Sequence, residues 1–146
     1  MDAVHTAQAD ATNPLNQDDV SAYALWAGVV QRATTWFNQA VRNYIDVLVA
    51  AKLPCLCSNG SLVNTTPGQL DASIYLWEAT CIAGKFFWGT SRTALINTED
   101  AVIVTQTGTA TISDLTKGTK YFVQFRADAA DPSEGARSGI YTEYAT

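Results

Sequence analysis

The chain has 146 residues and 47% of them are hydrophobic, which is enough for one well-packed core but not for two full-sized domains. The formal net charge is −5, and the nine Lys and Arg residues are dispersed along the chain, which argues against direct binding of nucleic acid. No apolar run reaches the length of about 18 residues that a membrane span requires, so we expect no contact with a membrane.

The first segment, residues 1–17, is small and polar, and Asn13-Pro14 is a turn signal within it. It has neither a cationic start nor an apolar stretch, so it does not resemble a secretory signal, and we expect synthesis in the cytoplasm. We expect these residues to form an extended arm. Because ordering a backbone costs about 1–2 kcal/mol per residue, an ordered arm would need contacts from a neighbouring chain.

The second segment, residues 18–52, has the periodicity of a long amphipathic helix. Asp18 or Asp19 can cap its start, and Pro54 enforces its end. Such a helix would be about 50 Å long, whereas a typical strand spans about 20 Å. Two outcomes follow: the helix breaks near Gly28, or its wide apolar face packs on other subunits.

We favour packing on other subunits, because exposed tryptophan and phenylalanine side chains would form an aggregation-prone patch. This predicts a homo-oligomer within a larger assembly, with neighbouring protein subunits as partners. The predicted interface residues are Trp26, Val29, Val30, Ala33, Trp36, Phe37 and Val41.

The third segment, residues 53–146, changes to strand-like patterns. Six or seven short runs separated by turn clusters are typical of a β-sandwich. One run, "SIYLWEATCI", predicts a strand with Tyr75 and Trp77 on the same face. Another, "YFVQFRADA", begins at Tyr121 and follows Leu115 and Gly118 in the pattern L-x-x-G-T-x-Y. We interpret Tyr121 as a structural group, because no histidine or other base lies nearby in sequence to make it reactive.

Residues 53–146 resemble a fibronectin type III domain. Trp77 resembles the tryptophan of the family's second strand, "GKFFWGTS" its third strand, and residues 109–138 its E strand, tyrosine corner, F strand and F–G loop. The resemblance implies a mainly β fold, an immunoglobulin-like sandwich preceded by the polar arm and the long helix.

The order of a helix followed by a type III module also resembles small bacterial and phage-encoded proteins. This resemblance implies a structural component of a phage head, neck or tail, located in the virion after synthesis in the host cytoplasm. A protein that stays in the cytoplasm is the alternative.

The sequence offers little for catalysis. Its three cysteines, Cys55, Cys57 and Cys81, are expected to be reduced, buried thiols. The only histidine, His5, lies in the polar arm, far from any nucleophile. The acids of residues 128–134 have oxygen ligands suited to calcium but lack the order of an EF-hand. We therefore predict a non-enzymatic protein with no catalytic, cofactor-binding or metal-binding residues.

A second hypothesis is an adhesion module that binds a glycan or a protein through the sandwich loops and exposed aromatic side chains. Phe86 and Trp88 should share one face of a strand while Phe87 takes the other, so at least one aromatic ring is expected at the surface. Phe87 and Trp88 are the candidate ligand surface, since aromatic side chains can stack on sugars or anchor a protein partner.

Overall fold

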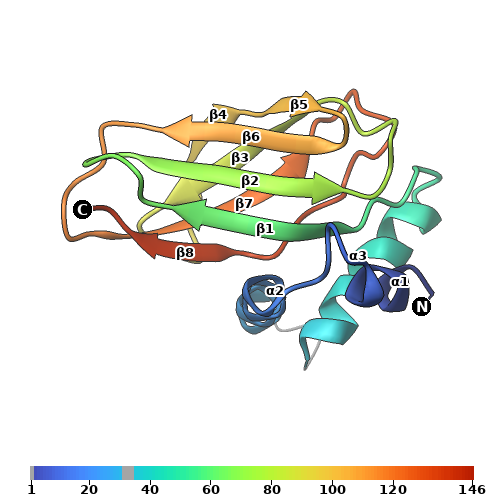
Figure 1. Cartoon of the computed structure of the whole chain (residues 1–146). Helices are drawn as coiled ribbons and strands as arrows, with labels where there is room; N and C mark the ends of the chain where they lie inside the picture. Colours follow the sequence, from blue (N-terminus) through green and yellow to red (C-terminus); the bar gives the residue numbers. More distant parts are fainter. Residues whose placement is uncertain (1, 31–34) are drawn as a thin grey trace.

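The computed structural model describes residues 2–30 and 35–146, which form three helices followed by eight strands (Figure 1). The helices are α1 (Asp2–Ala9), α2 (Gln17–Val30) and α3 (Trp36–Val49). They lie together against one side of the strands, and the two ends of the chain lie at opposite ends of the molecule (Figure 1).

The strands form two antiparallel four-stranded sheets, in the orders β1-β2-β6-β5 and β4-β3-β7-β8. The first sheet contains β1 (Cys57–Val63), β2 (Leu70–Leu76), β5 (Val102–Val104) and β6 (Thr107–Ile112). The second contains β3 (Gly84–Gly89), β4 (Asn97–Asp100), β7 (Lys120–Ala127) and β8 (Tyr141–Tyr144). The fold is a β-sandwich with an N-terminal helical part.

The main core lies between the two sheets. Alternate residues of β2 are buried, as expected for a strand with one inward face. Ile74 and Leu76 of β2 share this core with Phe86 of β3 and with Val123 and Phe125 of β7. The rings of Phe86 and Phe125 meet edge to face, with centroids 5.6 Å apart. Side chains from both sheets thus bury one another in a single apolar layer.

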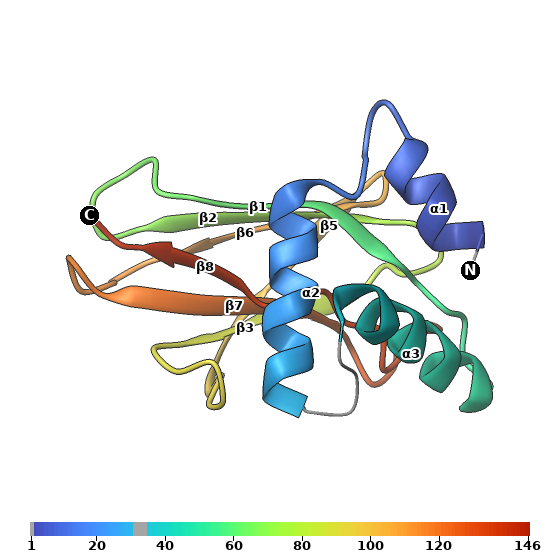
Figure 2. The ribbon, with the colours of Figure 1, turned by 90° about the horizontal axis from the view of Figure 1, so that it is seen from below.

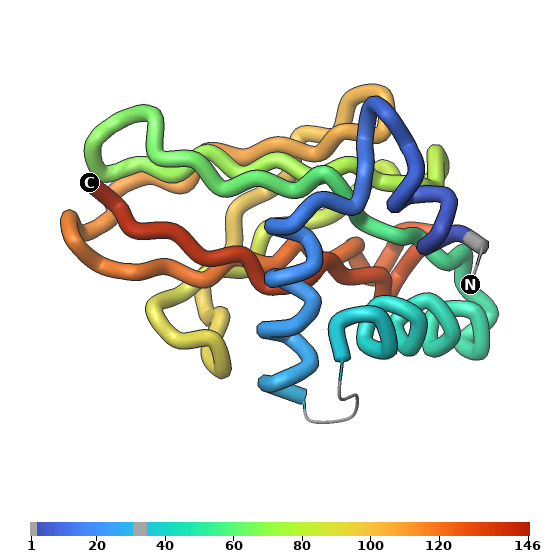
Figure 3. The backbone as a smooth tube through the Cα atoms, turned by 60° about the horizontal axis from the view of Figure 1, so that its bottom comes forward, coloured from blue at the N-terminus to red at the C-terminus, as the bar shows by residue number. Residues whose placement is uncertain are grey.

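A second core joins the helices to the sandwich. Its buried members are Val4, Ala7, Leu15, Tyr23, Trp26, Ala40, Leu56 and Ile140. Helix α2 passes across β1 and β8, the edge strands of the two sheets (Figures 2 and 3). The Ile140 N–H donates a 2.9 Å hydrogen bond to the Ala22 carbonyl, next to this crossing. The helical layer therefore covers strand edges that would otherwise be open to pairing with another chain.

The N-terminal segment differs from the expected extended arm. Residues Asp2–Ala9 form α1, and the Leu15 N–H donates a 2.9 Å hydrogen bond to the Ala7 carbonyl as the chain turns back. Val4, Ala7 and Leu15 of this segment are buried in the second core. Contacts within the same chain therefore hold the segment, where the sequence analysis expected a neighbouring chain.

The long helix expected for residues 18–52 is two helices, α2 and α3, which pack on each other. Helix α2 continues through Gly28 to Val30. Thr35 then caps α3, because its side chain accepts a 3.2 Å hydrogen bond from the Asn38 N–H. The division lets both helices fold back on the sandwich, which a single helix of that length could not do.

Strand boundaries also differ in two places. Strand β2 ends at Leu76, and its inward face carries Leu70, Ala72, Ile74 and Leu76. Tyr75 therefore lies on the outward side of β2, and Trp77, expected in the same strand, follows its end. Between residues 92 and 106, where the pattern is weakest, the chain forms the short strands β4 and β5.

Candidate functional site

The predicted interface residues lie mainly inside the molecule. Trp26 is buried, and Val29, Trp36, Phe37 and Val41 are half-buried against the second core. Val30 is 38% exposed. Ala33 lies outside the described residues. Most of the apolar face that suggested a partner chain is thus covered by the chain's own sandwich.

A different apolar surface remains open on α3. Ile45, Leu48 and Val49 are 50%, 57% and 80% exposed, and they lie three and four residues apart on one side of the helix. Leu53 follows the helix end and is also exposed, and its N–H donates a 3.0 Å hydrogen bond to the Pro132 carbonyl. We call Ile45, Leu48, Val49 and Leu53 the α3 apolar ridge.

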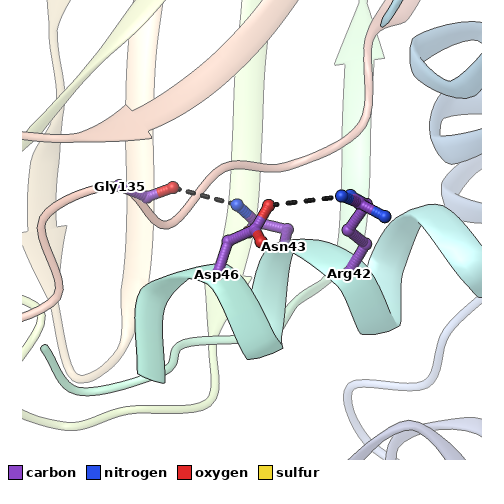
Figure 4. Close-up of polar contacts among 4 residues, drawn as sticks. All are labelled: Arg42, Asn43, Asp46 and Gly135. Carbon is purple, nitrogen blue, oxygen red and sulfur yellow. Dashed lines mark hydrogen bonds and ion pairs between the residues drawn. The ribbon is translucent and has the colours of Figure 1, made fainter. Parts of the chain in front are cut away.

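Polar side chains of α3 hold the helix, and with it the α3 apolar ridge, in a fixed position on the sandwich. The Asn43 side chain donates a 3.0 Å hydrogen bond to the Gly135 carbonyl and accepts one of 3.1 Å from the Arg137 N–H. Arg42 and Asp46 form an ion pair at 4.0 Å one turn apart (Figure 4). Asn43 thereby attaches α3 to the loop between β7 and β8, and the ridge faces away from the sandwich.

Asp19 is the polar centre of the contact between α2 and the sandwich. Its fully buried carboxylate accepts hydrogen bonds from three backbone N–H groups, those of Asn16 at 2.9 Å, Asn59 at 2.7 Å and Gly60 at 2.8 Å, and from the hydroxyl of Tyr141. Burial raises the pKa of Asp19, and these hydrogen bonds act in the opposite direction by favouring the ionised form.

A β-bulge in β1 supplies two of these donors. The register with β2 shifts between Ser58 and Ser61, and Asn59 adopts a φ of 48° there. Asp19, one of the two residues predicted as a possible cap, does not cap α2. The cap of α2 is instead Asn16, whose side chain accepts a 2.9 Å hydrogen bond from the Asp19 N–H.

The predicted corner residues lie together. Leu115 and Tyr121 are buried, Gly118 has a φ of 74°, and the Thr116 N–H donates a 2.9 Å hydrogen bond to the Tyr121 hydroxyl. The Trp88 ring packs on Tyr121 with centroids 5.9 Å apart. Tyr121 is therefore engaged in a backbone contact at the start of β7.

The change Tyr121→Phe should lower the free energy of unfolding by about 1 kcal/mol, because the Thr116 N–H loses its acceptor. Urea denaturation would measure the loss. Tyr144→Phe is the matched control, since Tyr144 is exposed on β8, and it should change stability by less than about 0.5 kcal/mol. Equal losses in the two variants would contradict the structural role of the Tyr121 hydroxyl.

The two candidate ligand-binding aromatics point in different directions. Trp88 lies on the inward side of β3 and packs against the main core. Phe87 lies on the outward side, where the guanidinium carbon of Arg126 is 4.3 Å from the centre of its ring. Phe87 is thus the aromatic ring that reaches the outer face of the second sheet.

The cysteine, histidine and acidic side chains that could act in catalysis or metal binding are either far apart or already in contact with other groups of the chain. Within residues 2–30 and 35–146, no group of three His, Cys, Asp or Glu side chains could hold a metal ion. The three cysteines are buried and free, and hydrogen bonding to a neighbouring thiol, together with burial, raises the pKa of Cys55 and Cys81. The Asp131 carboxylate accepts hydrogen bonds from the N–H groups of Ile82, Ala83 and Ser133 at 2.8–2.9 Å. His5 stacks on Phe37, with ring centroids 5.9 Å apart.

Sequence comparison finds no protein-family model that matches the chain and no matching curated protein. None of the helices formed by the described residues is long and apolar enough to cross a membrane.

Proposed function

We propose that this chain is a non-enzymatic structural subunit that associates with further copies of itself in a larger protein assembly. The observation that carries the proposal is the α3 apolar ridge, because four large aliphatic side chains within nine residues are exposed. The ridge replaces the arm and the inner helix face as the proposed contact.

A second copy is the occupant that we favour. Two ridges related by a two-fold axis present the same patch to each other, so one surface satisfies both partners. The exposed ion pair between Arg42 and Asp46 beside the ridge is charge-balanced, so it adds no net repulsion to a chain of net charge −5. A short helical contact of this kind belongs to the small class of interfaces, below about 1,200 Å², which suits a subunit that is held by several neighbours.

The proposal extends to the fold class of the sandwich and to the kind of assembly. We assign the sandwich to the immunoglobulin-like class, supported by the sheet orders β1-β2-β6-β5 and β4-β3-β7-β8, which correspond to the ABED and CFG strands of that class with one added edge strand. The resemblance to fibronectin type III modules supports a phage head, neck or tail as the assembly, with the protein in the virion.

The test is the mass of the protein in solution by light scattering. We expect the wild type to be a dimer or larger and Leu48→Glu to be a folded monomer, because a charge at Leu48 would have to be desolvated in the contact. Ile96→Glu is the matched control, since Ile96 is 81% exposed just before β4, and this variant should associate like the wild type.

A wild type that stays monomeric across the concentration range would reject self-association. The second candidate function, an adhesion module, would then gain weight. The observation that favours it is Phe87 with Arg126 on the outer face of the second sheet. Binding to a glycan array that is lost in Phe87→Ala would support the adhesion module.

A further inference from the structure

Two arginines lie side by side on the outer face of the second sheet. Arg126 projects from β7 and Arg137 follows in the loop that leads to β8, and the two residues pair across an isolated antiparallel bridge. The guanidinium of Arg126 is held over Phe87, and its Nε donates a 3.0 Å hydrogen bond to the Gln124 side-chain oxygen. Gln124 is itself buried and donates a 2.7 Å hydrogen bond to the Ser138 carbonyl. This hydrogen bond holds the Gln124 side chain, which in turn orients the guanidinium of Arg126.

Neither guanidinium has a carboxylate within 4.0 Å in the described parts of the chain, where the ion pairs are Arg42–Asp46, Lys52–Glu134 and Lys85–Asp100. Residue 1 and residues 31–34 contain no Asp or Glu that could serve instead. Burial and the neighbouring charge of Arg137 lower the pKa of Arg126 to about 10, and burial also lowers the pKa of Arg137. Two partly buried positive charges thus lie close together. Their repulsion is unfavourable unless a bound anion offsets it.

The two arginines line a cavity of about 320 Å³. Lys85 and Phe87 form one wall, and residues 127–129 and 134–136 form the rest. The Nη groups of Arg126 are not used by the Gln124 contact, so they remain available to an acceptor in this space.

We propose that this cavity binds an oxyanion, a carboxylate or phosphate group, between the guanidiniums of Arg126 and Arg137. Planar guanidinium groups match both kinds of oxyanion through paired N–H donors, and this geometry favours arginine over lysine. The site is separate from the α3 apolar ridge, so its test is independent of the proposed self-association.

Two carboxylates, those of Asp128 and Glu134, also line this cavity and oppose an anion there, and Glu134 is paired with Lys52. Asp128 has no such partner among the described residues; the pKa of Lys85 is raised mainly by its contact with Asp100 and in smaller part by the charge of Asp128. Asp128 forms no ion pair with Arg126 or Arg137, so it weakens the positive potential without neutralising either guanidinium. Its removal should therefore strengthen binding.

The experiment is an NMR titration of the full chain, labelled with ¹⁵N, with inorganic phosphate and separately with glucuronate at constant ionic strength held by chloride. We expect saturable shifts of the amides around Arg126 and Arg137. Because a hydrogen bond to a charged group contributes about 1.5–3 kcal/mol, Arg126→Gln and Arg137→Gln should each weaken binding at least about tenfold. Asp128→Asn should tighten it, and Arg92→Gln, which removes an exposed arginine beyond the other end of β3, should leave it unchanged.

Saturation by phosphate alone would assign the site to phosphate groups, and saturation by glucuronate alone would assign it to carboxylates; either result supports the oxyanion site. Absence of saturable shifts in the folded wild type would overturn it. Equal weakening by Arg92→Gln would also overturn it, because the effect would then come from net charge. Arg137→Gln leaves the stack on Phe87 in place, so it keeps the test valid if Arg126→Gln fails to fold.

Discussion

Replacement of Asp19 by alanine should lower the free energy of unfolding by about 4 kcal/mol or more. The carboxylate is the common acceptor for the N–H groups of Asn16, Asn59 and Gly60 and for the Tyr141 hydroxyl. Each buried donor left without an acceptor costs about 1–3 kcal/mol. Since a whole domain is stable by only about 5–15 kcal/mol, the variant should be largely unfolded at modest urea concentration.

Equilibrium urea denaturation, followed by tryptophan fluorescence and circular dichroism, would measure this loss. Asp18→Ala is the matched control, because Asp18 is an exposed acid in the first turn of the same helix and should contribute less than about 1 kcal/mol. Asp19→Asn separates shape from charge. It keeps the volume but turns an NH₂ group toward backbone donors, so it should also be destabilising. Stability of the alanine variant within about 1 kcal/mol of the wild type would show that water replaces the carboxylate.

The change Gly139→Ala should have the second-largest effect, a loss of about 3 kcal/mol. A Cβ atom at this position would lie 2.3 Å from the carbonyl carbon of Ala22 and 2.3 Å from the backbone nitrogen of Tyr23. Both atoms belong to the backbone of α2 and cannot rotate away. The helix would have to move, and the hydrogen bond from Ile140 to Ala22 would be lost with it.

The same substitution at Gly28 is the control. A Cβ atom there meets nothing within 4 Å, and the residue lies inside α2. Alanine should therefore stabilise the helix by about 0.5–1 kcal/mol. Thermal unfolding of the two variants should shift the melting temperature in opposite directions. A shared direction would mean that the close approach of residue 139 to α2 does not limit stability.

The periodicity of the sequence predicted individual strands and the turns between them. The alternation that begins at Tyr121 corresponds to β7, and the turn residues separate most of the strands. The helical periodicity of residues 18–52 is also real, but it does not show where a helix divides. The helix divides where each half can bury its apolar side chains. That place depends on the position of the sandwich, which is formed by residues later in the chain.

The candidate surfaces were harder to predict for the same reason. Ile45, Leu48 and Val49 are apolar like the buried residues of the same helix, and the sequence does not show that they lie on a side of α3 that stays exposed. Asp19 resembles any acid in a first helical turn, since its partners Asn59 and Tyr141 are 40 and 122 residues away. In the sequence, Arg126 and Arg137 look like ordinary residues of a strand and a loop. Only the pairing of their backbones brings them together.

The position of α2 across β1 and β8 sets an order on the formation of this molecule during synthesis. The helix is translated well before Ile140 and Tyr141, which contact it, because Asp19 and its partner Tyr141 are 122 residues apart. Contacts of such long sequence separation form slowly, because a long loop must close first. The second core, to which Tyr23 and Trp26 belong, thus lacks Ile140 until the segment just before β8 has been translated. A chain that stopped before β8 would keep the contacts of α2 with β1 but lack those with Ile140 and Tyr141, so the formation of β8 completes the docking of the helix.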